Sequence, residues 1–166
     1  MNGDPTPQQR AKQLVDTKTN MTLGTVDTSG APWVSPVFYV PDDQYDLYWT
    51  SWIEARHSEN VRNNPAVAIV IYHSVPDEPV DAVYMAAHAV ELKDPDDVAR
   101  GMEIMARRDD LQPEWWRIGS ISEVTRSGPW RIYRASPQTI EVRKQIEVAD
   151  KRVVTREPAE FRTPAQ

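Results

Sequence analysis

The residues with the clearest chemical potential lie in one short segment, where a predicted strand is followed by a short helix. Thr50 and Ser51 end an aromatic-rich strand, Arg56 and His57 begin the helix, and Pro65 precedes the next apolar strand. Exposed N–H groups in the first turn of a helix, together with the positive end of its dipole, attract anions. The hydroxyls, the guanidinium and the imidazole add donors and charge at the same place. This spacing predicts a site for a phosphate group.

The rest of the sequence carries no strong catalytic motif. Cysteine is absent, which excludes disulfides, thiolate metal ligands and cysteine nucleophiles. His57, His73 and His88 are far apart and form no His-x-x-His motif, so no metal site is predicted. The sequence also lacks a Gly-x-Ser-x-Gly elbow, a P-loop and a Gly-x-Gly-x-x-Gly loop. No catalytic residue is identified, and a bound phosphorylated cofactor is expected to supply any chemistry.

The composition is that of one globular domain. The chain has 166 residues, of which 40% are hydrophobic and 27% are charged, and it is long enough to bury a core. A net charge of −6 argues against a nucleic-acid partner. No apolar run approaches the roughly 20 residues of a membrane helix, and no secretory signal is visible. These features favour a cytoplasmic protein without a membrane partner.

The pattern of apolar residues divides the chain into three parts. Residues 1–20 are predicted to form an N-terminal arm with an amphipathic helix, and residues 21–147 to form a strand-rich domain. Residues 148–166 combine mixed charge with prolines and are expected to be a poorly ordered tail. A further helix is predicted after Asp94, a good N-cap residue.

The strands of the central domain are predicted to pair as hairpins. Pro36 interrupts one of them and indicates an edge strand or a bulge. Near the end of the domain, Ser136 and Pro137 indicate a turn between two strands. Short connections of this kind favour a mainly β fold, an antiparallel barrel of six to seven strands with flanking helices.

Three runs of the sequence resemble, in order and spacing, the pyridoxamine 5′-phosphate oxidase-like, flavin-binding split-barrel superfamily. Leu23–Val37 is similar to its opening hairpin, Leu47–Ile69 to its central strand–helix–strand unit, and Trp130–Pro137 to its closing strand. The resemblance covers roughly residues 8 to 146. It is more specific for the fold than for the reaction.

The resemblance implies a split-barrel homodimer with FMN, or in some branches the deazaflavin F420, in a groove at the dimer interface. The backbone of residues 34–37 would border the flavin ring, Thr50 and Ser51 would lie near the ribityl chain or the phosphate, and Arg56 and His57 would bind the phosphate. Trp52 and Trp130 are candidates for contact with the flat ring. The cofactor-binding residues expected from this comparison are Val34, Ser35, Pro36, Val37, Thr50, Ser51, Arg56, His57 and Trp130.

One departure from the family pattern leaves the function open. Many flavin-binding members have a lysine where this chain has His57, and a neutral imidazole is a weaker phosphate partner than an ammonium group. The first hypothesis is an FMN-dependent oxidoreductase acting on an unidentified small molecule. The second is a non-catalytic dimer that binds a flavin, F420 or another ligand. Haem binding is a third hypothesis and requires a histidine ligand that the sequence does not single out.

Overall fold

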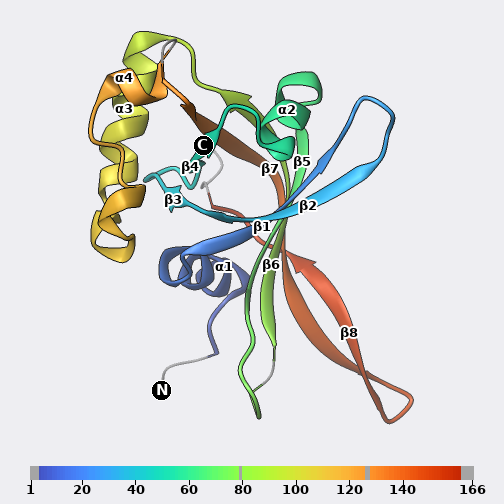
Figure 1. Cartoon of the computed structure of the whole chain (residues 1–166). Coiled ribbons are helices and arrows are strands. Elements are labelled where there is room, and N and C mark those ends of the chain that lie inside the picture. Colours follow the sequence, from blue (N-terminus) through green and yellow to red (C-terminus); the bar gives the residue numbers. More distant parts are fainter. Residues whose placement is uncertain (1–3, 79, 126–127, 162–166) are drawn as a thin grey trace, which may run out of the picture.

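The computed structural model describes residues 4–78, 80–125 and 128–161 of the chain. Strands contain more of the described residues than helices do, and the helices lie between them or before them (Figure 1). In chain order the elements are α1 (Pro7–Thr17), β1 (Asn20–Val26), β2 (Pro32–Phe38), β3 (Val40–Pro41), β4 (Leu47–Trp52), α2 (Arg56–Asn63), β5 (Ala66–His73), β6 (Asp81–Glu91), α3 (Pro95–Ala106), the 3-10 helices η1 (Asp109–Leu111) and η2 (Glu114–Trp116), α4 (Ile121–Val124), β7 (Trp130–Val148) and β8 (Lys151–Pro158).

The strands form one antiparallel sheet that closes on itself. Neighbouring strands follow the order β2-β1-β5-β6-β7-β4-β3, and β8 pairs with β7 outside this path. The first and last strands of the path, β2 and β3, are separated in the chain by Tyr39 alone. A single bent segment therefore joins the two edges of the sheet, which confirms the predicted barrel.

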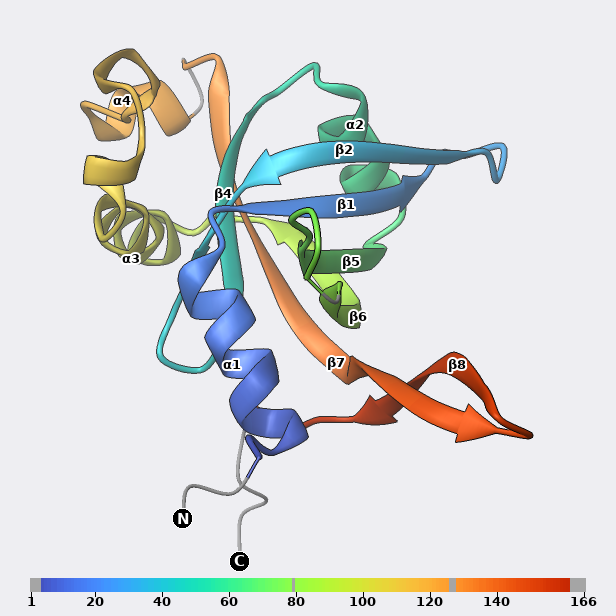
Figure 2. The same cartoon turned by 90° about the horizontal axis from the view of Figure 1, so that it is seen from below.

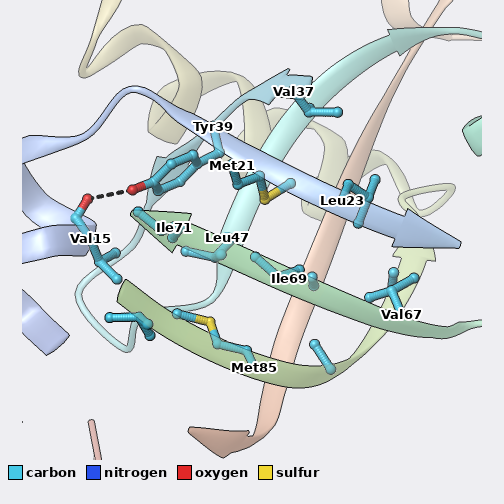
Figure 3. Close-up of a cluster of buried hydrophobic side chains, with 14 of the residues drawn as sticks. Val15, Met21, Leu23, Val37, Tyr39, Leu47, Val67, Ile69, Ile71 and Met85 are labelled. Carbon is cyan, nitrogen blue, oxygen red and sulfur yellow. Dashed lines mark hydrogen bonds between the residues drawn. The ribbon is translucent and has the colours of Figure 1, made fainter. Parts of the chain in front are cut away.

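Two hydrophobic cores lie on either side of strand β4. Leu47 and Trp49 point into the barrel, while Tyr48 between them packs under α3. The barrel interior is filled by alternate residues of β1, β5 and β6, and α1 closes one side of it (Figure 3). This alternation is the period of two that the sequence shows, since successive side chains of a strand face opposite sides.

Helix α2 begins at Arg56 and α3 follows Asp94, as the sequence predicts. Thr6 and Gln9 form a capping box at the start of α1, and the Asp94 carboxylate accepts hydrogen bonds from the first turn of α3. Both α3 and α4 lie on the side of β4 that faces away from α2 (Figure 2). Pro36 lies on β2, which pairs with β1 alone among the described strands, so the predicted edge position is confirmed.

The end of the chain differs from the sequence prediction. Ser136 and Pro137 form no turn, because both lie within the continuous strand β7 and face His88 and Ala87 of β6. A shift of register follows directly, where Gln138 has no partner on β6; a bulge of this kind accommodates a residue without an N–H donor such as Pro137.

The predicted irregular tail is a strand instead. Strand β8 pairs with β7 in register from Val148 opposite Lys151 to Glu141 opposite Pro158, and this hairpin extends away from the barrel (Figure 1). The turn is made by Ala149 and Asp150, which have φ values of 49° and 61°. Residues 162–166 of the expected tail lie outside the described residues.

Arg108 joins α1 to the barrel. Its guanidinium donates to the carbonyl oxygens of Lys18 and Tyr39 through Nη1, at 2.8 and 3.1 Å, and to those of Val15 and Asp16 through Nη2, at 3.1 and 2.7 Å. Two of these carbonyls lie in the last turn of α1, where no intrahelical donor reaches them. The Val15 carbonyl also accepts the buried Tyr39 hydroxyl at 2.8 Å (Figure 3).

We predict that Arg108→Gln lowers the free energy of unfolding by about 2–4 kcal/mol, because it removes charged hydrogen bonds and leaves carbonyl groups unpaired. Urea unfolding monitored by tryptophan fluorescence measures the change. The matched control is Arg107→Gln, which removes an exposed pair with Asp43 and should cost less than about 1 kcal/mol. Equal losses in the two variants would contradict the role given to Arg108.

Candidate functional site

A cavity of 290 Å³ opens between the barrel and the connection from α3 to β7. Strands β2 and β4, the start of α2 and the start of β7 form its barrel side, and η2, α4 and the loops beside them form the other side. Two larger cavities, of 600 and 590 Å³, lie at the bulge of β7 and between α3 and α4. None of the site residues predicted from the sequence lines either of these larger cavities.

Six of the nine predicted residues line the 290 Å³ cavity: Pro36, Val37, Thr50, Ser51, His57 and Trp130. The other three are placed elsewhere. Val34 lies on the outer face of β2 with 59% of its surface exposed. Ser35 is buried, and its hydroxyl accepts a hydrogen bond from the Trp33 indole at 3.0 Å.

The third of these residues, Arg56, contacts the hairpin between β1 and β2. Its Nη2 lies 3.4 Å from Asp27 Oδ2, and its guanidinium lies over the Trp33 ring at 4.4 Å from the ring centre. Hydrogen bonds from the side chain of Ser29 and the backbone of Ala31 and Ser29 lower the pKa of Asp27 to about 2. Asp27 is therefore ionised over the whole working range of pH and attracts the arginine.

Ser51 and His57 form a hydrogen-bonded pair inside the cavity. Ser51 Oγ lies 2.7 Å from His57 Nε2, and the serine is buried. Burial lowers the pKa of His57, so the imidazole is neutral at neutral pH. Among the described residues no carboxylate pairs with His57, and a serine–histidine–acid triad is therefore not formed there. The pair offers hydrogen bonds to a ligand and little charge.

The first turn of α2 faces the same cavity without a side-chain cap. Its N-cap is Ala55, which lines the cavity and provides no capping hydrogen bond, whereas Thr6 and Asp94 cap α1 and α3. The first N–H groups of a helix have no intrahelical acceptor. These donors and the positive end of the helix dipole are suited to an anion, as the sequence predicts.

Hydrogen bonds to β1 and β4 hold α2 in this position, and a further bond connects β1 to β2. Asn60 Nδ2 donates to Thr25 Oγ1 on β1 at 2.9 Å, and both residues are buried. The Thr25 hydroxyl in turn donates to the Trp33 carbonyl on β2 at 3.4 Å. The Ser51–His57 pair joins the helix to β4. Asn60 therefore braces α2 against the barrel through a side chain of β1.

Large aromatic side chains line the remaining walls. Trp52 and Trp130 face each other across β4 and β7, and Phe38 lies at the end of β2. From the other side, Trp116 of η2 reaches the cavity. Trp52 and Trp116 are 48% and 50% exposed, which is unusual for side chains of this size. Such walls fit a flat, partly apolar ring.

Sequence reasoning missed most of the wall that follows α3. Gln112, Arg117, Ile118 and Glu123 all line the cavity, and they come from a segment with no family signature and weak periodicity. The sequence offers one signal for this wall, the tryptophan pair at positions 115 and 116, which suits a groove mouth or a dimer seam, and Trp116 does line the cavity. The side chain of residue 115 lies outside the described part.

The outer face of β2, β1, β5 and β6 carries small and apolar residues in register. Val34, Gly24, Ala68 and Ala86 lie opposite one another on successive strands. A Cβ atom on Gly24 would lie 3.3 Å from the Ala68 carbonyl oxygen, so the strands approach closely here. The neighbouring row consists of Pro36, Thr22, Val70 and Tyr84. Neither row contains a charged residue.

The other two histidines lie away from the cavity. His73 Nδ1 is 2.8 Å from Lys18 Nζ, and its Nε2 is 3.0 Å from Glu78 Oε2. His88 is exposed on β6. Within the described ranges, no three His, Cys, Asp or Glu side chains come together as metal ligands would. The same ranges contain no helix with the length and apolar character needed to cross a membrane.

Comparisons with solved structures identify several proteins of the same fold. The haem storage protein HutZ from Vibrio cholerae has 18% sequence identity and a TM-score of 0.63, over 84% of this chain and 94% of that chain. An FAD-binding protein from Mesorhizobium loti has 19% identity and a TM-score of 0.63, over 79% and 89%. A candidate pyridoxamine 5′-phosphate oxidase from Listeria innocua has 18% identity and a TM-score of 0.59, over 81% and 96%.

Identities this low establish the fold alone. Among curated proteins, none matches the chain. The family model described as pyridoxamine 5′-phosphate oxidase matches residues 7–162, which is nearly the whole chain and contains every residue of the cavity. The chain therefore belongs to the pyridoxamine 5′-phosphate oxidase-like split-barrel family.

Proposed function

We propose that this protein is a homodimeric, FMN-dependent oxidoreductase that acts on a small molecule. The observation that carries the proposal is the joining, in one cavity, of an uncapped helix N-terminus and exposed tryptophans. The first fits a phosphate group and the second fits a flat ring. Membership of the family and likeness to an FAD-binding protein add support.

The residues of the chain would bind and orient the cofactor. The α2 N-terminus, Ser51 and His57 would donate hydrogen bonds to the phosphate end, and Trp52 and Trp130 would contact the ring and exclude water. FMN supplies hydride and electron transfer when bound, so the protein itself needs no strong acid or base. This agrees with the lack of a complete catalytic triad at Ser51.

The outer face of β2, β1, β5 and β6, which carries small and apolar residues, is suited to form a dimer interface. A cavity of 290 Å³ lies at the lower end of the range of ligand sites, about 300 to 1,000 Å³, so further walls would help to enclose a molecule as large as FMN. A second copy packed on this face would bring further walls close to β2. Val34, which the family resemblance places at the flavin ring, lies on that face.

The direct test is cofactor binding followed by turnover. Purified protein should show flavin absorbance or should gain it on titration with FMN, and bound FMN should be reduced by NAD(P)H or by a reduced substrate. F420 is titrated in parallel. Binding without reduction by any donor supports the alternative, a non-catalytic ligand-binding dimer, which the neutral state of His57 favours. A protein that binds neither FMN nor F420 would refute both flavin hypotheses.

Haem is a further candidate because two of the similar solved structures are described as haem proteins, from Vibrio cholerae and from Mycobacterium smegmatis. Titration with haemin distinguishes it from the flavins. If the Soret band shifts and the change saturates at one haem per chain, and no flavin binds, haem replaces FMN as the proposed cofactor. Substitution of His88, which is exposed, and of His57 would then identify the ligand.

We predict that FMN affinity rises as the pH falls from about 8 to about 6. Burial lowers the pKa of His57, whereas a phosphate beside the imidazole raises it, so binding takes up a proton and is favoured at lower pH. A difference of one pKa unit between free and bound states corresponds to roughly tenfold in affinity.

Isothermal titration with FMN and riboflavin measures this effect. Riboflavin lacks the phosphate, so the ratio of the two affinities isolates the phosphate contact. The control His57→Asn keeps a hydrogen-bonding group beside Ser51 but does not titrate. The ratio should become nearly independent of pH in this variant; an unchanged pH dependence would place the phosphate away from His57.

We also predict that Ala68→Glu converts the protein to a monomer and weakens FMN binding by at least roughly tenfold, because it buries a charge in the proposed interface. Ala68 lies at the centre of the outer face and is exposed in the single chain. Sedimentation velocity measures the oligomeric state. Ala99→Glu, on the exposed side of α3, is the control, and a dimeric Ala68→Glu protein would exclude this face as the interface.

A further inference from the structure

We propose that Arg117, rather than Arg56, supplies the positive charge that holds the anionic end of the ligand in the 290 Å³ cavity. This inference rests on the proposed function and assigns the phosphate contact to a residue on the wall opposite α2. Its basis is the position of each arginine relative to the cavity and the partners that each one has.

Arg117 is the only permanently charged cation among the described residues that line the cavity. Its Nη2 donates a hydrogen bond to the carbonyl oxygen of Gln112, at 3.1 Å, within the same segment. No carboxylate of the described chain lies within ion-pair distance of it. The remaining N–H groups of a guanidinium form a planar fork that matches the oxygen atoms of a phosphate.

Arg56 is held in a different place. It does not line the cavity, and it contacts Asp27 and the Trp33 ring instead. Because Asp27 is ionised throughout the working pH range, moving Arg56 to the cavity would separate it from a charged partner and from an aromatic face. Arg56 is therefore better placed to fix the β1–β2 hairpin against α2 than to bind a ligand.

The charge balance of the cavity makes a cation necessary. Glu123 of α4 also lines the cavity, and its carboxylate accepts a hydrogen bond from Ser120 at 3.2 Å. A phosphate would bring a charge of roughly −1.5 to −2 near this carboxylate. His57 is neutral in the free protein at neutral pH, so the permanently charged Arg117 is the stronger partner for this charge. Replacement of Glu123 should accordingly raise the affinity for FMN, whereas replacement of Arg117 should lower it.

The experiment compares FMN and riboflavin binding by titration in the full chain at constant ionic strength. In Arg117→Gln, FMN should bind roughly tenfold more weakly, while riboflavin affinity stays within about twofold. A roughly tenfold loss of affinity is at the lower end of the range for a charged hydrogen bond, because the Arg117 side chain is exposed. Glu123→Gln should bind FMN a few-fold more tightly. Arg152→Gln, an exposed arginine of β8, is the control for net charge.

Arg56→Gln decides between the two arginines. A loss of FMN affinity in Arg56→Gln with none in Arg117→Gln overturns the inference and leaves the flavin function intact. If the wild type binds no flavin, inorganic pyrophosphate is used instead, with thermal stabilisation and quenching of tryptophan fluorescence as the readouts. Pyrophosphate binding that requires Arg117 would support the anion contact although the flavin function had failed; binding that does not require Arg117, or no binding, overturns it.

Discussion

The buried hydrogen bond between Asn60 and Thr25 is the constraint on which the site depends. At 2.9 Å, between two side chains excluded from solvent, it fixes the distance between α2 and the barrel, and the Thr25 hydroxyl continues the connection to β2. An unpaired amide or hydroxyl at this depth would be costly, so the helix has little freedom to shift. The N–H groups of its first turn, which have no cap of their own, are thereby held at the edge of the cavity.

The cavity is a consequence of the way that β4 divides the two cores. Leu47 and Trp49 complete the barrel interior, and Tyr48 packs beneath α3. Beyond this point the strand continues to Thr50, Ser51 and Trp52, while α3 has turned away, and its connection to β7 returns as η2 and α4. The space left between them is lined by polar groups from the barrel and by side chains of the returning segment.

The sequence is sufficient to predict the barrel but not the whole site. Alternation in β1, the cap of α3 and Pro36 at an edge are local signals, and the structure agrees with them. The β7–β8 hairpin was missed because its turn, Ala149–Asp150, lacks the glycine that usually permits positive φ. Pro137 was read as a turn because a sequence does not show that a bulge can accommodate it. The wall that contains Arg117 depends on long-range packing, for which no local pattern exists.

The two arginines illustrate why residue type and spacing locate a site more reliably than they assign its contacts. Arg56 and His57 are adjacent in sequence and begin the same helix, so a phosphate contact was expected of both. Successive helical residues point about 100° apart, however, and only His57 lines the cavity. Arg56 instead meets an aspartate whose turn holds it ionised. If Arg117 provides the positive charge, then α2, Ser51 and His57 need to provide only directed hydrogen bonds. The charge and the hydrogen bonds would then come from opposite walls of the cavity. A neutral histidine at the position where the family resemblance leads one to expect a lysine is then consistent with a working phosphate site, because the positive charge has a different source.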